Sequence, residues 1–219
     1  DLPFSVFKKG DFSAAAKLYL LGATQGDLNS QYMLGLCLSY PGKQQDVAAA
    51  AAWFTKAAAQ GHTEAYYQLG NLYRAGSGET PLPGVPLDSV EAERWWKKAA
   101  QEDHPAALFN LGNLYSSDDG TGVAGDLKKA YTYYDRAVAA YRERIASGFP
   151  LQRYLNDAIQ ARRSAWRSLK REQLLMALSK IGLSKYHPIL RAARAGDIDE
   201  VRELLASGVN VDTPFTDGS

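Results

Sequence analysis

The side chains best suited to chemistry in this sequence are histidines and a cysteine, and their positions argue against an active site. His62 and His104 follow two equivalent segments that end in AAAQG and AAQED, so we expect both to be turn residues between helices. A metal site needs several convergent ligands, and none are evident around them. Cys37 aligns with Leu72 and Leu114, which predicts a small core residue instead of a nucleophile. We therefore expect no catalytic residue, no metal and no cofactor.

Two glycine-bearing loops also lack the residues that a known ligand would require. Residues 76–84, GSGETPLPG, have neither the Lys nor the following Ser or Thr of a phosphate-binding loop. Residues 116–126, SSDDGTGVAGD, lack the ligand spacing and the closing Glu of a calcium-binding loop. Both segments are interpreted as connections between repeats.

Composition excludes little and points to no charged partner. The 219 residues carry 25 Lys and Arg against 24 Asp and Glu, a net charge of +1, which gives no overall reason to expect DNA or an anionic membrane as the ligand. A single cysteine cannot form an intrachain disulfide. No apolar run is long enough for a membrane helix.

The dominant feature is an internal repeat of two alternating units. The first unit contains a glycine and occurs as SQYMLGLCL at 30–38, EAYYQLGNLY at 64–73 and PAALFNLGNLY at 105–115. The second unit occurs as AAWFTKAAAQG at 51–61, AERWWKKAAQED at 92–103 and AYTYYDRAVAAY at 130–141, and an earlier copy, AKLYLLGATQG, lies at 16–26.

Each unit has the pattern of an amphipathic helix, because its apolar residues recur at intervals of three and four. Gly35, Gly70 and Gly112 fall inside these helices, where glycine costs about 1 kcal/mol against alanine, so we expect a paired helix to approach closely there. Aspartates that can cap helix starts precede the second units: Asp11, Asp46, Asp88 and Asp126. Gly26 and Gly61 are expected to end helices in the left-handed conformation. Such helix pairs must stack on neighbours to bury their apolar faces.

The residues themselves resemble a known family. The pattern A-x-Y-x-L-G-x-x-Y followed by A-x-x-W-x-x-K-A-A-x-x-G, seen in Ala65 to Tyr73 and Ala50 to Gly61, is similar to Sel-one-like repeats, which are relatives of tetratricopeptide repeats. The resemblance covers about residues 11–141, with Leu38 in place of a tyrosine and Asp103 in place of a terminal glycine. It implies an all-α fold, a right-handed α-solenoid of helix pairs, over a first domain of residues 1–141.

The chain changes character after residue 141. Gly148 and Pro150 should break the preceding helix, and a long helix is predicted from near Leu151 to Ile181. Residues 142–171 contain eight Arg and Lys residues but only two acidic residues, Glu143 and Asp157. We interpret residues 142–186 as a basic helical connector.

The last segment resembles a different repeat. Residues 187–212, HPILRAARAGDIDEVRELLASGVNVD, are similar to an ankyrin repeat through Pro188, Ala192, Ala193, Gly196, Val201, Leu204, Leu205, Gly208 and Val211. His187 and Leu190 depart from its usual residues. Because short ankyrin arrays are rarely stable alone, we expect residues 187–219 to begin a longer array that continues beyond residue 219.

The resemblance also implies a binding surface. In Sel-one-like repeats the first helix of each pair lines the concave face, and the variable positions between its consensus residues point outward. These are Gln31, Tyr66, Gln68, Asn71, Arg74, Leu108, Asn110 and Asn113, with Met33, Leu36, Ser39 and Ser116 in the same set. Aromatic, amide and arginine groups on a rigid surface suit protein recognition. A solvated groove without a partner is the alternative.

The function that follows is a non-catalytic module for protein–protein interaction, an adaptor without a small-molecule substrate. A narrower hypothesis, from the family resemblance alone, is a bacterial immunity protein that binds a cognate secreted toxin or lipase effector. Because bacterial members often carry a leader and this sequence begins at Asp1, we expect a trimmed protein of the periplasm or cell envelope, with the cytoplasm as the alternative.

A basic helix leaves two other functions open. Arg162, Arg163, Trp166, Arg167, Lys170 and Arg171 recur at helical spacing and could bind nucleic acid or an acidic protein surface, although a solvated helix face is the commoner explanation. An enzyme with an unrecognised site is the last alternative.

Overall fold

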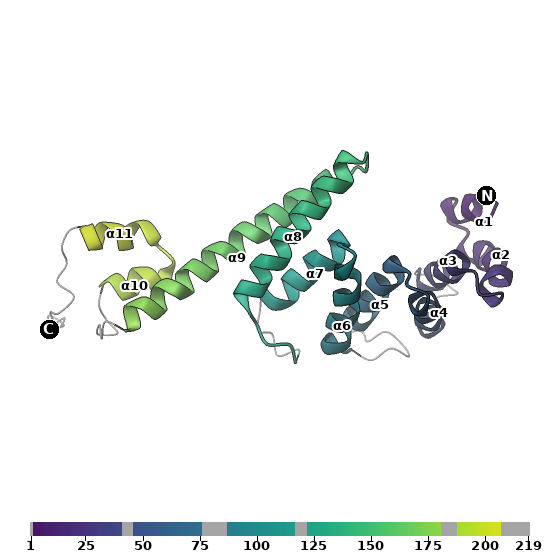
Figure 1. Ribbon diagram of the computed structural model, residues 1–219, viewed down its shortest axis with the longest axis horizontal. Coiled ribbons are helices and arrows are strands. Elements are labelled where there is room, and N and C mark those ends of the chain that lie inside the picture. Colours follow the sequence, from purple (N-terminus) through teal and green to yellow (C-terminus); the bar gives the residue numbers. More distant parts are fainter. Residues whose placement is uncertain (1, 41–45, 76–86, 117–121, 181–187, 207–219) are drawn as a thin grey trace. The chain divides into compact units, whose positions relative to one another are not determined.

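The computed structural model describes residues 2–40, 46–75, 87–116, 122–180 and 188–206, which form helices and turns with no strand in these ranges (Figure 1). Its helices are α1 (Leu2–Lys8), α2 (Phe12–Thr24), α3 (Leu28–Ser39), α4 (Val47–Ala59), α5 (Thr63–Ala75), α6 (Ser89–Gln101), α7 (Pro105–Ser116), α8 (Leu127–Ala146), α9 (Gln152–Ser179), α10 (Pro188–Ala195) and α11 (Ile198–Ala206).

The chain forms two compact units, Asp1–Ile159 and Gln160–Ser219, and α9 begins in the first and ends in the second. In the first unit, every helix from α1 to α8 packs against its neighbours along the chain (Figure 1). Packing between sequence neighbours is the defining property of a solenoid, and the predicted all-α solenoid is confirmed. The predicted division of the chain near residues 141 and 186 rests on sequence patterns and stays a prediction.

The helix ends lie where the capping residues predicted them. The carboxylates of Asp11, Asp46, Asp88 and Asp126 accept backbone N–H groups in the first turns of α2, α4, α6 and α8, at 2.9–3.0 Å. Each carboxylate thereby satisfies an amide that has no partner inside its helix. Asp103, which replaces the terminal glycine of its repeat, adopts the same left-handed backbone at φ 48° that Gly61 adopts at φ 88°.

Close helix packing explains the glycines inside the first helices. A Cβ atom built on Gly35 would lie 2.6 Å from Phe54, and one on Gly112 would lie 2.5 Å from Tyr134. No real side chain fits at such distances. Gly70 meets Trp96 in the same way, so each of the three glycines contacts a ring on the second helix of its own pair. The predicted reason for these glycines is therefore confirmed.

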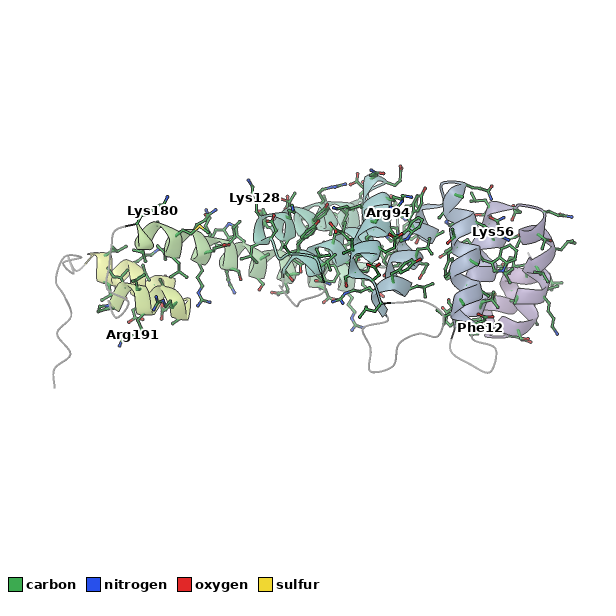
Figure 2. The ribbon with its side chains drawn as sticks, turned by 90° about the horizontal axis from the view of Figure 1, so that it is seen from below. Phe12, Lys56, Arg94, Lys128, Lys180 and Arg191 are labelled. Carbon is green, nitrogen blue, oxygen red and sulfur yellow. The ribbon has the colours of Figure 1, made fainter. Side chains whose placement is uncertain are left out.

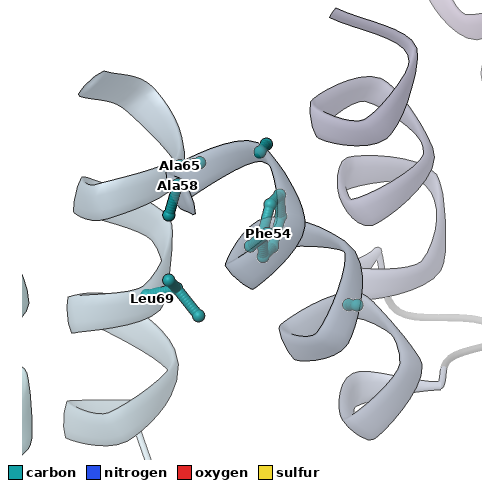
Figure 3. Packing of buried hydrophobic residues seen from close by; sticks show 6 residues of the cluster. Phe54, Ala58, Ala65 and Leu69 are labelled. Atoms are coloured by element: carbon teal, nitrogen blue, oxygen red, sulfur yellow. The ribbon is translucent and has the colours of Figure 1, made fainter. Parts of the chain in front are cut away.

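The core runs continuously from one helix pair to the next. Phe54 and Ala58 of α4 pack with Ala65 and Leu69 of α5, all nearly inaccessible (Figure 3). Trp53, the residue beside Phe54, packs against the preceding cluster of α2 and α3. Lys56, which is labelled in Figure 2, is exposed, and its Nζ lies 4.0 Å from the centre of the Trp53 ring. The consensus Trp and Lys thus close the boundary between successive pairs.

The change of character after α8 has a clear local cause. Helix α8 ends at Ala146, Gly148 takes a left-handed φ of 92°, and α9 begins at Gln152, so the predicted break is confirmed. Tyr141 of α8 and Tyr154 of α9 stack at 6.2 Å between ring centres. None of the helices in the described ranges is long and apolar enough to cross a membrane.

In the second unit, the end of α9 packs with α10 and α11 around a small apolar cluster. Its buried members include Leu178, Ile189 and Val201. The α10–α11 pair lies where the ankyrin-like pattern predicts two helices, but its assignment to that family stays a prediction. Residues 187 and 207–219 of that pattern lie outside the described residues.

Candidate functional site

Two of the eight predicted contact residues point into the protein, and their prediction as surface residues is wrong. Gln31 is 5% exposed: its Nε2 donates to Ala23 O at 3.2 Å, and its Oε1 accepts from Gln60 Nε2 at 2.9 Å. Leu108 is fully buried. Both are the fourth residue of a first helix, and this register faces the neighbouring helices instead of solvent.

Tyr66 occupies the same register but keeps part of its ring exposed. Its ring stacks on Trp95 of α6 at 6.0 Å, and Lys98 Nζ lies 5.5 Å from the Tyr66 ring and 4.3 Å from the Trp95 ring. The buried Trp95 Nε1 has no hydrogen-bond partner among the described residues. Tyr66 and Arg74, four residues before and after Gly70, lie toward the side of α5 where Gly70 meets Trp96 of α6. Tyr66 therefore flanks the predicted surface instead of lying in its middle.

The remaining five residues form one continuous face, which we call the amide face. Gln68, Asn71 and Arg74 follow one another at three-residue spacing on α5, and Asn110 and Asn113 do so on α7. Asn110 Nδ2 donates to Asn71 Oδ1 at 3.0 Å, which brings the two first helices side by side. Asn113 is exposed and the other four are half-buried.

Two asparagines of the amide face also have a structural role that the sequence pattern did not reveal. Asn71 Oδ1 accepts from Trp96 Nε1 at 3.2 Å, and Asn113 Oδ1 accepts from Tyr134 Oη at 2.7 Å. In the α3–α4 pair, the residue after the core glycine is Leu36. It packs against the cluster that contains Phe54, whose ring has no polar atom. An asparagine therefore follows the core glycine where the ring on the second helix has a hydrogen-bond donor, and a leucine follows it where the ring has none. Each amide keeps its NH₂ donors for other bonds.

The two turn histidines are structural, as predicted. His62 Nδ1 accepts from Ala65 N at 3.3 Å and His104 Nδ1 from Ala107 N at 3.1 Å, so each ring caps the helix that follows it. Burial lowers the pKa of His62. The rings also stack on tyrosines of the preceding first helix, His62 on Tyr32 at 4.4 Å.

His104 makes a further link that could not be read from the sequence. Since its Nδ1 accepts, its Nε2 carries the proton and donates to Glu64 Oε2 at 2.9 Å. This hydrogen bond lowers the pKa of the Glu64 carboxyl. Glu64 lies in the first turn of α5, so the bond ties one helix pair to the next.

A second unpredicted polar cluster joins α6 to α7. Glu93 Oε1 accepts from the Tyr115 hydroxyl and lies 2.5 Å from Lys97 Nζ. Burial and the bond to Glu93 raise the pKa of Tyr115 to about 12. The Glu93 carboxyl is partly desolvated, which works against ionisation, but the bonds from Lys97 and Tyr115 leave its pKa below the usual value. The cluster therefore joins the two helices through a carboxylate that Lys97 and Tyr115 both contact.

Cys37 and the residue types that bind metals are the remaining candidates for chemistry. Cys37 is buried, and burial raises the pKa of its thiol to about 11, which keeps it protonated and unreactive near neutrality. Within the described ranges, no cluster of three or more His, Cys, Asp or Glu residues could hold a metal. The loops at 76–84 and 117–121 lie outside the described residues.

The basic stripe of α9 is a separate surface in the second unit. Arg163, Trp166, Arg167, Lys170 and Arg171 are exposed, and Arg162 is half-buried. Trp166 is 50% exposed, an unusual degree for such a large ring. The predicted stripe therefore exists as a solvent-accessible surface.

Comparison with known proteins agrees with the helix pairs seen in the structure. A family model described as the Sel1 repeat matches residues 5–27, 28–62, 63–104 and 105–140. These ranges overlap the pairs α1–α2, α3–α4, α5–α6 and α7–α8 in turn, although α1 begins before the first match and α8 ends after the last. The first match begins ahead of residue 11, where the resemblance was expected to start. No curated protein matches the sequence.

Solved structures show the same architecture. The chain is similar to a Sel1 repeat protein from Oxalobacter formigenes, with 30% identity over 56% of this chain and 88% of that one, and a TM-score of 0.50. It is also similar to a protective antigen of uropathogenic Escherichia coli strains that displays an SLR fold, with 23% identity, 91% and 46% coverage, and a TM-score of 0.51.

An immunity protein from Pseudomonas aeruginosa is 15% identical over 93% of this chain and 77% of that one, but its TM-score of 0.28 supports no argument about fold or function. The four family matches together cover more than half of the 219 residues. The chain belongs to the Sel1 repeat family.

Proposed function

We propose that this protein is a non-catalytic binding module whose amide face, flanked by Tyr66, holds a protein partner. Sel1 repeats generally mediate protein–protein interaction. The observation that carries the proposal is the Asn110–Asn71 hydrogen bond, because it joins the variable residues of two consecutive first helices into one surface. A surface already held in place by such contacts loses little side-chain entropy when a partner binds.

The side chains of the amide face suit a mainly polar protein interface. Its amides can donate and accept hydrogen bonds with peptide groups, and Arg74 adds a planar cation at the end of α5. The Tyr66–Trp95–Lys98 cluster supplies aromatic area beside it. Aromatic and arginine residues contribute most of the binding free energy in many interfaces.

The test compares two variants of the full chain as bait for quantitative affinity purification. Gln68→Ala with Arg74→Ala alters the amide face, whereas Arg163→Ala with Arg153→Ala removes two exposed cations from α9 and serves as the control. Proteins captured by the parent and the control, but lost from the amide-face variant, are the expected partners. For a purified partner, Tyr66→Ala and Arg74→Ala should each weaken binding by about 1 kcal/mol or more in calorimetry. Equal capture by all three baits contradicts this assignment.

The narrower role is that of an immunity protein for a secreted toxin or lipase effector, and it is supported by the family resemblance alone. If it holds, the protein should form a stable complex with a toxin encoded beside its gene and should restore growth to cells that express that toxin. A neighbouring toxin that neither binds the purified chain nor is neutralised by it counts against the role.

A further inference from the structure

The second unit contains a cavity of about 1060 Å³ that is open to solvent, since most of its lining residues are exposed, and that the amide face does not explain. It lies between the second half of α9 and the turn that joins α10 to α11, whose positions can be followed in Figure 1. Its wall includes Trp166, Arg167, Lys170 and Arg171 of α9, together with Asp197 and Arg202 near α11. Its volume lies just above the range of about 300–1,000 Å³ for sites that bind small molecules.

The cavity is built on fixed backbone contacts. Arg171 Nε donates to Ala193 O at 3.1 Å, and the Arg171 stem passes beside Gly196, where an added Cβ would meet its Cδ at 3.8 Å. Gly196 takes a left-handed φ of 82°. Asp197 accepts from Glu200 N at 2.9 Å and so caps α11. The Arg171 bond holds α9 against the end of α10, and the Asp197 cap fixes the start of α11.

The charges of the wall are unevenly satisfied. Asp197 caps α11, and Asp199 Oδ1 lies 3.2 Å from Arg202 Nη1 in an ion pair whose two side chains are largely exposed. On α9, Lys170 Nζ donates only to the Gln173 amide at 3.3 Å among the described residues, and Arg167 has no carboxylate partner in that part of the chain. The cavity therefore presents cations whose bonding capacity is directed at solvent, beside the half-exposed Trp166 ring.

We propose that this cavity binds an acidic peptide segment of a protein partner, with carboxylates at Arg167 and Lys170 and an apolar side chain against Trp166. Arginine and lysine form charge-assisted hydrogen bonds with carboxylates, and an aromatic ring adds contact area at low entropic cost. This site shares no residue with the amide face.

A peptide fits the wall better than a nucleic acid. A strand of DNA or RNA carries a phosphate at every nucleotide and needs a continuous basic track with several stacking rings. Here Asp197 and Asp199 interrupt the basic wall, and Trp166 is the single aromatic residue among the residues that line the cavity. A peptide can place a few carboxylates at the cations and direct neutral groups or N–H donors toward the two aspartates.

The test measures fluorescence anisotropy of the full chain with a labelled peptide pool, in which Asp and Glu alternate with randomised apolar residues. A matched pool replaces Asp and Glu by Asn and Gln. We expect the acidic pool to bind at least about tenfold more tightly than the amide pool, with an affinity that falls as salt is added.

The variants locate the binding. Arg167→Gln with Lys170→Gln should weaken binding of the acidic pool by about tenfold or more, whereas Arg153→Gln with Arg163→Gln, the same loss of charge on the same helix, should change it by less than about twofold. Arg167→Lys with Lys170 intact should retain binding. Circular dichroism and thermal melting confirm that each variant remains folded, which is expected because these side chains are exposed.

Three results would overturn the proposal. They are equal affinity of the two peptide pools, parent-like binding by the Arg167 and Lys170 variant, and tighter binding of oligo-dT than of the acidic pool with the same dependence on these two cations. The last result would assign the cavity to nucleic acid.

Discussion

Replacing Gly70 by leucine should destabilise the protein, because the Trp96 ring occupies the space that a side chain at position 70 needs. A single Cβ there would already meet Trp96 Cδ1 and Nε1 at distances that real Cβ atoms do not show. The ring cannot easily move, since Trp96 is 3% exposed and its Nε1 is bonded to Asn71. The helices α5 and α6 would therefore have to separate.

The size of the effect follows from two opposing terms. Overpacking a filled core costs about 1–3 kcal/mol. Leucine adds three carbons beyond the clashing Cβ, so we expect a cost near the upper value, about 3 kcal/mol. Replacing glycine by leucine inside a helix stabilises the helix by about 0.8 kcal/mol. The net loss of about 2 kcal/mol should lower Tm by roughly 4–8 °C in a chain of this size. Gly70→Ala should show a smaller loss in the same direction.

Gly22→Ala is the matched control, because Gly22 also lies inside a helix but faces a more adaptable neighbour. An added Cβ there would meet the Ser30 hydroxyl at 2.5 Å, which can rotate away, and the Ser30 Cβ at 3.0 Å, which has to shift by only a few tenths of an ångström. We expect this variant to unfold at or near the parent's urea concentration, measured by circular dichroism. Trp96→Val in the Gly70→Leu background should recover part of the lost stability. Gly70→Leu with the parent's unfolding curve would refute the packing explanation.

Three further predictions concern stability and reactivity. Amide hydrogen exchange should be faster in α10 and α11 than in α5 to α7, because the latter helices are stacked on both sides; equal rates would contradict this. Cys37 should react with a thiol reagent at pH 8 only after unfolding, since burial raises its pKa to about 11, and rapid labelling of the native protein would show that this interpretation is wrong. Glu64→Gln should reduce the free energy of unfolding at pH 7. Because the pKa of Glu64 is lowered in the folded state, this difference should be present above the ordinary value of 4.5 and should decline as pH falls through the lowered pKa; a difference that grows with acid would oppose it.

The local features of the fold could be predicted because each depends on a few neighbouring residues. An aspartate before an apolar run caps a helix in any context, as Asp46 and Asp126 do. A glycine inside a helical pattern implies a close neighbour, and Gly35 has one in Phe54. The consensus could not indicate which of two adjacent aromatics fills the place over the glycine. Trp53 faces the preceding pair, and Phe54 is the ring that covers Gly35.

The candidate surface was predicted less well, because exposure depends on the side chains that neighbouring helices place against each position. Gln31 and Leu108 share a register with Tyr66, yet only Tyr66 remains partly exposed. The repeat pattern specifies a register but not the residues that a neighbouring pair brings against it. Similarly, the His104–Glu64 bond joins residues 40 positions apart, and no local pattern indicates it.

The pairing of Asn71 with Trp96, of Asn113 with Tyr134 and of Leu36 with Phe54 limits how the repeats can be exchanged. A chimera that moves a whole helix pair transfers the ring together with its acceptor. A chimera that places α6 in the position of α4 would set an indole N–H against Leu36, and a buried donor without a partner costs about 1–3 kcal/mol. Duplication or recombination at the short turns between pairs is therefore tolerated better than exchange of single helices, so the inherited module is the pair.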